Sequence, residues 1–365
     1  MLRVSPFTTS HTNPNKPCRN IHPRRPDKGE LQKRRMDIYT RRASFYCAAI
    51  IILGRSPTQR VRSTRPQQSA KGASEEAARA LPAQRREFEG RALIEMEEQM
   101  SEVIVITSGK GGVGKTTTTA NLGAGLASQG KKVILIDADI GLRNLDVVLG
   151  LESRIVFDLV DVVEGKCRLK QAIIRDKNQP NLSLLPTAQT KDKNAVSPEQ
   201  MRKLCAQLRE DYDYVLIDCP AGIEQGFKNA IAGADKALVV TTPEVSAIRD
   251  ADRIIGLLEA NELPPPMMIL NRVKPDMIKR GDMLTLEDVA GVLAIDVLGI
   301  VPDDERILVS SNRGEPVIKD ENSQAAQAFR DIVRRLLGET VPLMDLFGED
   351  NTGFIQKIKD FFKRQ

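Results

Sequence analysis

A glycine-rich loop between two apolar segments constrains the fold of this 365-residue chain more than any other feature. Residues 109–116 read Gly-Lys-Gly-Gly-Val-Gly-Lys-Thr and satisfy the pattern G-x-x-x-x-G-K-[ST]. The apolar run Val103–Ile106 precedes this loop, and Thr116–Ser128, which has helical spacing, follows it. A glycine-rich backbone can curl so that several N–H groups surround a phosphate chain, and the following helix adds its positive end. The pattern therefore predicts a strand, a phosphate-binding loop and a helix in direct succession.

Short apolar runs alternate with helical patterns along the rest of the chain. The runs are rich in β-branched residues and apolar throughout, as in strands that are buried on both faces. They are Val103–Ile106, Val133–Ile136, Val215–Ile217, Leu238–Val240, Met267–Leu270 and Leu298–Val301. Segments such as Ala247–Ala260 have helical spacing. This alternation predicts an α/β protein with a mostly parallel central sheet and helices on both faces, and the loop at 109–116 makes it a P-loop NTPase.

Five polar residues near the ends of these strands suit phosphate chemistry. Lys115 can reach the β- and γ-phosphates of a nucleotide, and the Thr116 hydroxyl can bind Mg²⁺. Asp218 ends the strand Tyr-Val-Leu-Ile-Asp, where a carboxylate is placed to hold Mg²⁺ directly or through water. Asp137 and Asp139 follow another strand, and they are either solvated turn residues or a metal ligand and a residue that orients the attacking water. We expect ATP and Mg²⁺ as the cofactors.

Charge and residue usage exclude several classes of function. Residues 1–99 contain 20 Lys and Arg against 10 Asp and Glu, which leaves 34 against 39 for residues 100–365. A mildly acidic main part disfavours non-specific binding of DNA. Both histidines, His11 and His22, lie near the start of the chain, so a His-dependent triad or zinc site in the main part is excluded. The five cysteines form no C-x-x-C pair, which is typical of reduced cytosolic thiols.

Residues 1–99 differ from the rest, and we expect a basic, disordered extension ahead of an ATPase domain at 100–348. Their Arg- and Ser-rich composition is that of an organellar transit peptide, which would place the protein in the chloroplast stroma. The alternative is a misassigned start, with the protein beginning at Met100 in a bacterial cytoplasm. Two observations favour the alternative. Met100 directly precedes the first strand, and the codons of Glu97 and Glu98 give a purine run where a ribosome-binding site would lie.

Residues 349–365 combine a polar linker with an amphipathic segment. Its apolar residues fall at i, i+1, i+4, i+7 and i+8, and they are Phe354, Ile355, Ile358, Phe361 and Phe362. Cations lie on or beside the opposite face, and they are Lys357, Lys359, Lys363 and Arg364. This pattern predicts a short helix that lies in the interface of an anionic membrane, although apolar stripes of this kind more often pack on a protein core. A free helix of this length is marginal in water, so we expect it to form on lipid.

A second lysine in the loop, Lys110, follows its first glycine directly. With it the chain resembles the deviant Walker A (ParA/MinD) family of P-loop ATPases, and within that family the septum-site-determining ATPases of the bacterial Min system. The matching stretches are residues 107–123, 137–146, 217–224 and 246–253, and the resemblance runs from Met100 to the C-terminus. Residues 1–99 have no counterpart in the bacterial family.

The resemblance implies a site shared between two copies of the chain. In this family the early lysine, here Lys110, reaches the partner's nucleotide, so hydrolysis depends on dimerisation, and Lys110, Lys115 and Asp139 are the implied catalytic residues. The implied metal ligands are Thr116, Asp137 and Asp218. The implied nucleotide contacts are Gly109, Lys110, Gly111, Gly112, Val113, Gly114, Lys115, Thr116 and Thr117, with Asn271, Arg272, Pro302 and Asp303 around the adenine. The segment 141–146 resembles the switch region that senses the γ-phosphate.

The resemblance also implies a cellular role and partners. It predicts an ATP-dependent homodimer that binds the cytoplasmic face of the bacterial inner membrane peripherally and positions the division site. The expected partners are the division inhibitor MinC and, where present, the regulator MinE. A DNA-partitioning ATPase of the same fold is the main alternative and would require an exposed basic patch. A redox protein with a cluster held by Cys167, Cys205 or Cys219 and a small-molecule kinase are weaker alternatives, since the sequence shows neither paired ligands nor an acceptor pocket.

Overall fold

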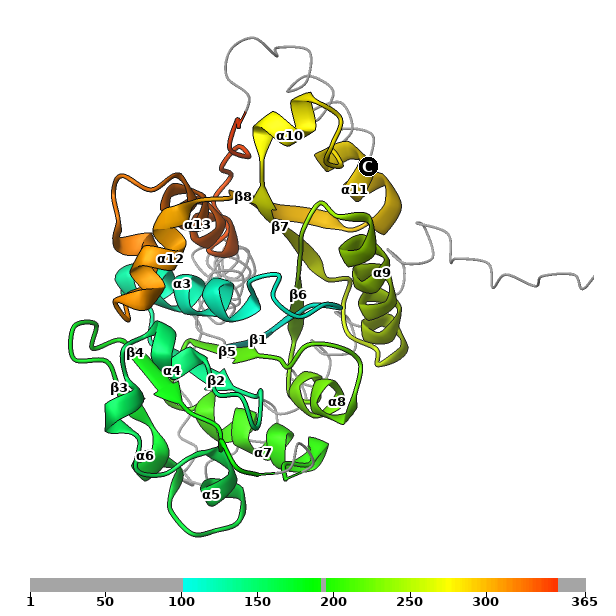
Figure 1. Cartoon of the computed structure of the whole chain (residues 1–365). Helices are drawn as coiled ribbons and strands as arrows, with labels where there is room; N and C mark the ends of the chain where they lie inside the picture. Colours follow the sequence, from blue (N-terminus) through cyan, green and yellow to red (C-terminus); the bar gives the residue numbers. More distant parts are fainter. Residues whose placement is uncertain (1–100, 192–194, 347–365) are drawn as a thin grey trace, which may run out of the picture. The chain divides into compact units, whose positions relative to one another are not determined.

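The computed structural model describes residues 101–191 and 195–346, which form an eight-stranded sheet covered by helices (Figure 1). The strand order is β3-β4-β2-β5-β1-β6-β7-β8, and every neighbouring pair is parallel except β3 with β4. The strands are β1 (Glu102–Thr107), β2 (Val133–Asp137), β3 (Ile174–Arg175), β4 (Leu182–Leu185), β5 (Tyr214–Asp218), β6 (Lys236–Thr241), β7 (Met267–Val273) and β8 (Asp296–Pro302). The predicted α/β class and mostly parallel sheet are thereby confirmed.

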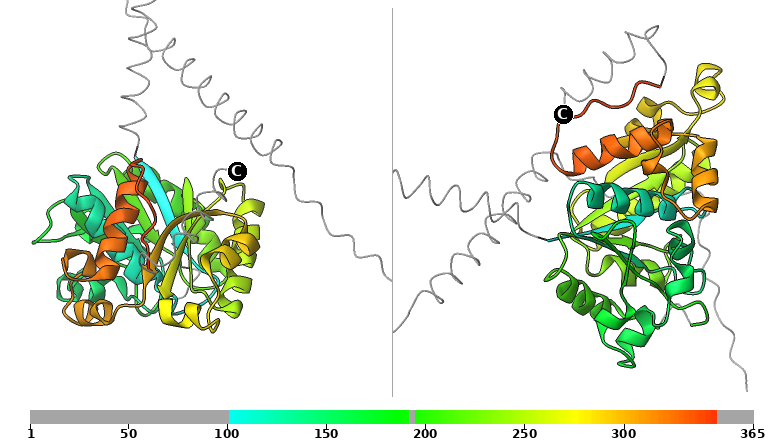
Figure 2. Two further views of the ribbon diagram at one scale, coloured as in Figure 1. Left: turned by 90° about the horizontal axis from the view of Figure 1, so that it is seen from above. Right: turned by 90° about the vertical axis from the view of Figure 1, so that its left-hand side faces the viewer.

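Helices connect the parallel strands and cover both faces of the sheet (Figure 2). The α-helices are α3 (Lys115–Ser128), α4 (Leu145–Val148), α5 (Leu159–Val163), α6 (Leu169–Ala172), α7 (Pro198–Leu208), α8 (Gln225–Ile231), α9 (Val245–Ala260), α10 (Pro275–Lys279), α11 (Leu286–Leu293), α12 (Glu305–Asn312) and α13 (Gln324–Leu336). Two 3₁₀ turns are η1 (Glu152–Arg154) and η2 (Val317–Lys319).

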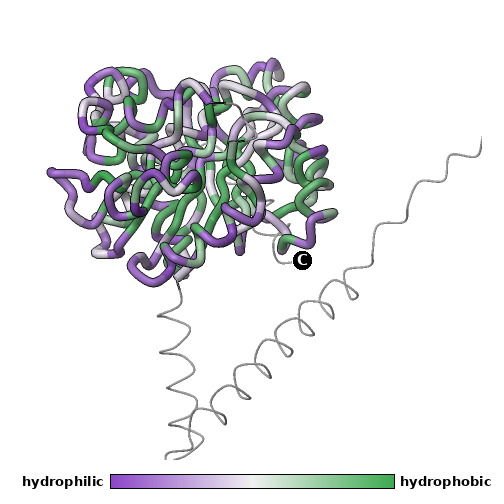
Figure 3. Tube along the Cα trace, turned by 90° about the horizontal axis from the view of Figure 1, so that it is seen from below, coloured by the Kyte–Doolittle hydropathy of each residue, from purple (hydrophilic) through white to green (hydrophobic). Residues whose placement is uncertain are grey.

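Each central strand is apolar throughout because its side chains enter two different cores. On β1, Val103 and Val105 pack into the core beneath α7, α8, α9 and α11, whereas Ile104 and Ile106 pack into the core beneath α3 and α13. Successive side chains of a strand point to opposite faces, so a strand covered on both sides needs continuous apolar sequence. The hydropathy of the trace in Figure 3 follows this arrangement, with apolar segments inside and polar ones at the periphery.

The six predicted strands and the two predicted helices are all present, with ends that differ by a few residues. Two further strands, β3 and β4, were not predicted from the sequence. The strand β4 reads Leu-Ser-Leu-Leu and lacks the β-branched residues that marked the other strands, while β3 is only two residues long. Both strands lie beyond β2 at one side of the sheet, with β3 at the edge. There, pairing with neighbouring strands decides the conformation more than local sequence does.

Two predictions lie outside the described residues, namely the basic extension of residues 1–99 and the amphipathic segment of residues 349–365. Within 101–191 and 195–346, no helix is both long and apolar enough to cross a bilayer.

Candidate nucleotide-binding site

The glycine-rich loop joins β1 to α3 and is packed closely on two other elements. Gly114 precedes α3 with a φ of 102°, a left-handed conformation that favours glycine. A Cβ atom at Gly114 would also overlap the side-chain amide of Asn271, and one at Gly109 would overlap the backbone of Asp250 in α9. The loop therefore follows its path because glycine removes the side chains that would collide with α9 and with the end of β7.

The two lysines of the loop occupy different environments. Lys115 is only 8% exposed, and its charge acts on the carboxylate of Asp218. The side chain of Lys110 is 43% exposed, and its Nζ lies 3.2 Å from Glu244 Oε2 and 3.3 Å from Ser246 Oγ. One cation therefore lies inside the loop, and the other stands at its rim against the start of α9.

Asp137 and Asp218 end neighbouring strands and are paired in register between β2 and β5. Both are buried, at 1% and 2% exposure, so Asp137 is not the solvated turn residue of the alternative interpretation. Burial, and next the charge of Asp218, raises the pKa of the Asp137 carboxyl well above its ordinary value. Burial also raises the pKa of Asp218, although a hydrogen bond from Thr116 and the charge of Lys115 act against this.

These side chains offer hard oxygen donors in a buried place. Thr119 Oγ1 lies 3.5 Å from Asp218 Oδ1 and adds a second hydroxyl beside that of Thr116. Two buried carboxylates repel each other, and a divalent cation between them would relieve this repulsion. Among the described residues, no group of three or more His, Cys, Asp and Glu side chains could hold a metal alone. The set therefore suits an ion whose remaining ligands come from a phosphate chain and water.

Asp137 also fixes the loop that follows β2. Its Oδ1 accepts the backbone N–H of Asp139 at 3.0 Å, and its Oδ2 accepts that of Leu145 at 3.2 Å. Arg143 adopts a positive φ of 44°, and its Nε lies 2.9 Å from Asp146 Oδ2. Burial raises the pKa of Asp146 despite this arginine. Asp137 therefore bonds the backbone just before the predicted switch segment 141–146 and near its end, and the Arg143–Asp146 ion pair lies within the segment.

The four residues predicted to surround the adenine lie at, or directly after, the ends of two adjacent strands. In the β7–β8 ladder Val273 pairs with Pro302, which brings the loop at Asp303 beside the end of β7. The side chain of Asn271 is buried, and it bonds to the loop rather than lying open to a ligand. Its Nδ2 donates to the Val113 carbonyl at 2.8 Å, and its Oδ1 accepts the Arg272 N–H at 2.9 Å.

Several residues around the loop were not identified from the sequence. Glu244 and Ser246 contact Lys110, Asp250 packs on Gly109, and Thr119 reaches Asp218. They come from segments far apart in the sequence, and β6 leads α9 to the loop only because β6 is the neighbour of β1. No local signal gives this strand order.

Comparisons with known proteins agree with this geometry. A model of the AAA domain family matches residues 101–262. The septum site-determining protein MinD of Bacillus subtilis is 58% identical over 265 residues, which cover 72% of this chain and 98% of the relative. The chain belongs to the MinD family. A protein assigned to plasmid partition resembles this chain less closely than the MinD proteins do, so the DNA-partitioning alternative is the weaker one.

Solved structures of MinD proteins show the same fold. The MinC:MinD cell division protein complex of Aquifex aeolicus matches with 50% identity and a TM-score of 0.64, covering 68% of this chain and 100% of the other. The MinD protein of Pyrococcus horikoshii, solved with Mg-ADP, matches with 32% identity and a TM-score of 0.60, covering 65% and 96%. As a MinD-family P-loop ATPase, the chain acts in the determination of the septum site.

Proposed function

We propose that the chain is a Mg²⁺-dependent ATPase whose hydrolysis step requires an ATP-bound homodimer. The observation that carries this proposal is the position of Lys110. Its ammonium group is half exposed at the rim of the loop, whereas buried Lys115 already supplies the cation inside. A second cation at the rim is placed to act on the nucleotide of another molecule, where it would neutralise charge that develops on the transferred phosphoryl group.

Each remaining group has a role within its own copy of the chain. The loop amides and the start of α3 bind the phosphates, and Lys115 contacts the β- and γ-phosphates. Thr116, Asp218 and Asp137 hold Mg²⁺, which when bound neutralises charge on the phosphate oxygens. Asp139 orients the attacking water, and its backbone is fixed by Asp137. The solved Mg-ADP complex of the Pyrococcus horikoshii relative supports this assignment of nucleotide and metal.

The contacts to the adenine base come from the ends of two strands. Asn271 and Arg272 at the end of β7, with Pro302 and Asp303 at the end of β8, lie beside one another. We assign Arg272, Pro302 and Asp303 to the base. The Asn271 side chain, whose amide is already bonded to Val113 and to the Arg272 N–H, braces the loop instead.

The ATPase cycle then controls reversible binding of residues 354–364 to an anionic membrane. One short amphipathic helix binds lipid weakly, but two on a dimer gain avidity by about 10²–10⁴ without new contacts. ATP would therefore hold the dimer on the membrane, and hydrolysis would release the monomer into the cytoplasm of a bacterium, or into the chloroplast stroma if residues 1–99 act as a transit peptide. The Aquifex aeolicus MinC:MinD complex supports MinC as the inhibitor that the membrane-bound dimer recruits. A regulator such as MinE would act by accelerating hydrolysis.

The experiment is the ATPase rate per mole of protein, measured over a wide range of protein concentration. The proposal predicts a rate that rises with concentration and then reaches a plateau, and it predicts that Lys110→Ala stays near the low rate throughout. A rate per mole that is the same at every concentration, together with full activity of Lys110→Ala, would refute the shared site. A small residual monomer rate would be compatible with it.

A further inference from the structure

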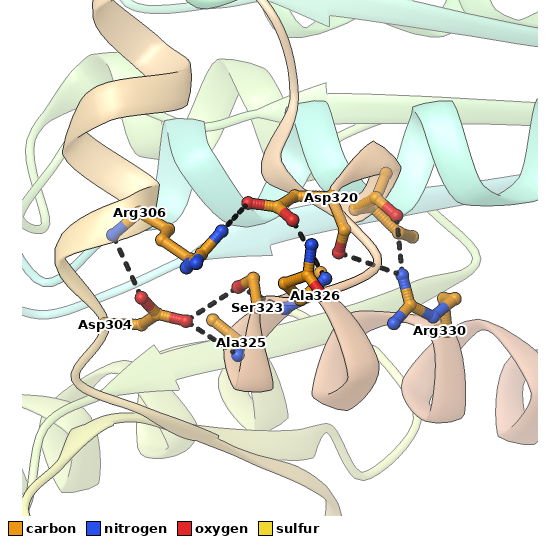
Figure 4. Close-up of polar contacts among 9 residues, drawn as sticks. Asp304, Arg306, Asp320, Ser323, Ala325, Ala326 and Arg330 are labelled. Atoms are coloured by element: carbon orange, nitrogen blue, oxygen red, sulfur yellow. Dashed lines mark hydrogen bonds and ion pairs between the residues drawn. The ribbon is translucent and has the colours of Figure 1, made fainter.

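Asp304 lies at the junction between the loop assigned to the adenine and two helices (Figure 4). The strand β8 ends at Pro302, and the backbone N–H of Asp303 donates to the Val273 carbonyl at 2.9 Å. Asp303 is exposed, and its carboxylate forms a 3.2 Å ion pair with Lys274. Asp304 follows directly, is partly buried, and points its carboxylate toward the starts of α12 and α13.

Both oxygens of the Asp304 carboxylate are used at the starts of helices. Oδ1 accepts the backbone N–H of Arg306 at 2.9 Å in the first turn of α12. Oδ2 accepts the hydroxyl of Ser323 at 2.6 Å and the backbone N–H of Ala325 at 3.2 Å in the first turn of α13. A carboxylate at a helix N-terminus is favoured by both the free N–H groups and the helix dipole. The 2.8 Å ion pair of Arg306 with Asp320 is a second contact between α12 and the residues that precede α13.

The helix α13, whose first turn bonds Asp304, is also connected to the phosphate-binding part of the site. α13 packs on α3 and η2. In η2 the Ile318 N–H donates to Asn121 Oδ1 at 2.8 Å, and Asn121 Nδ2 donates to the Thr117 carbonyl at 2.8 Å. Asn121 and Thr117 belong to the first turns of α3, directly after the phosphate-binding loop. One block formed by η2 and α13 therefore supports both the base loop, through Asp304, and the phosphate loop, through Asn121.

We propose that Asp304 is a positioning residue for base recognition, because it locks the Pro302–Asp303 loop to the same block that carries the phosphate-binding helix. The inference rests on the proposed contact of that loop with adenine. Without the Asp304 carboxylate the loop keeps its covalent attachment to β8 but loses its fixed distance from α3. The phosphate site itself contains no atom of Asp304, so its affinity for phosphates stays the same.

The test compares a nucleotide with a phosphate chain that has no base. Calorimetric titration of the full chain in the presence of Mg²⁺ would use ADP, GDP and inorganic tripolyphosphate, with wild type, Asp304→Ala and Asp304→Asn. We expect Asp304→Ala to weaken ADP about tenfold, the factor that corresponds to one or two lost hydrogen bonds. The ADP:GDP affinity ratio falls with it, and tripolyphosphate changes less than about twofold. Asp304→Asn, which keeps one acceptor oxygen, lies between, and it serves if the alanine variant does not fold.

Asp158→Ala is the matched control. Asp158 caps α5 by accepting the N–H groups of Val160 at 2.8 Å and Asp161 at 3.0 Å, so its loss destabilises a helix start away from the base loop. This control should lower thermal stability without changing the ADP:GDP ratio. The inference is overturned if Asp304→Ala weakens ADP and tripolyphosphate equally, or leaves ADP unchanged while wild type discriminates against GDP. If wild type binds ADP and GDP equally, the adenine assignment itself is wrong and the inference falls with it.

Discussion

The side-chain amide of Asn271 donates a hydrogen bond to the backbone carbonyl of Val113 at 2.8 Å, which joins the end of β7 to the middle of the phosphate-binding loop. Asn271 is 3% exposed, so the carbonyl it satisfies is out of reach of bulk water. The nucleotide site is thus braced from the side of the base as well as from β1 and α3.

Asn271→Ala should weaken both the fold and nucleotide binding. It leaves the buried Val113 carbonyl without its partner, and an unsatisfied buried group costs about 1–3 kcal/mol. Chemical unfolding and ADP titration measure the two effects. Asn261→Ala is the control, because Asn261 makes a similar 2.7 Å bond to the Leu257 carbonyl in an exposed position. Equal losses in the two variants would show that the bond to the loop has no special importance.

Lys110→Ala should abolish most hydrolysis while leaving the monomer stable. A cation supplied to a transferring phosphoryl group by a partner is worth about 10³–10⁵ in rate, whereas a half-exposed ion pair contributes about 0–1 kcal/mol to stability. Lys191 offers a matched control, since its side chain is 41% exposed and lies 3.2 Å from Glu164. Lys191→Ala should retain normal turnover. A Lys110→Ala protein with normal turnover would exclude the proposed role in the shared site.

The stability contributed by Asp304 should depend on pH. Burial alone would raise the pKa of Asp304, but hydrogen bonds from Ser323, Arg306 and Ala325 outweigh it, and its pKa lies below the ordinary value of 3.8. A carboxyl whose pKa is lowered by folding stabilises the protein above its unfolded pKa, and this contribution disappears as the pH falls through the folded pKa. The difference in unfolding free energy between wild type and Asp304→Asn, measured in urea, should therefore be constant above about pH 5.5 and shrink below about pH 4.

The difference in unfolding free energy could instead stay constant down to the lowest pH at which both proteins remain folded. That result would mean that the charge of Asp304 does not contribute to stability. Arg306 and Asp320 are present in both proteins, so the difference between the two proteins follows from the carboxylate of Asp304.

The cysteines of the described region should differ in reactivity. Burial raises the pKa of the Cys205 and Cys219 thiols to about 12, and both side chains are 1% exposed. Cys167 is only partly buried. Because the thiolate is the reactive form, alkylation at neutral pH followed by peptide mass spectrometry should find Cys167 modified first. Rapid modification of Cys205 or Cys219 in the folded protein would contradict the burial of these two thiols.

The features of the fold and the site that depend on a local sequence pattern could be predicted from the sequence. The loop at 109–116, the strand before it and the acids Asp137 and Asp218 at strand ends all follow from short stretches, because phosphate binding and parallel strands impose strict local requirements. The contacts of Lys110 with Glu244, and of Asp304 with Ser323, depend on strand order and on how helices meet. Such contacts join residues that are distant in the sequence, so no sequence periodicity predicts them.

If the bound nucleotide controls residence on the membrane, co-sedimentation of the full chain with anionic liposomes must depend on that nucleotide. Phe361→Glu, which puts a charge on the apolar face of the segment 354–364, should lose binding in either nucleotide while keeping wild-type affinity for ATP. Wild-type protein should sediment with liposomes in Mg-ATP and stay in the supernatant in Mg-ADP. Equal sedimentation in ATP and in ADP would contradict this control by the nucleotide.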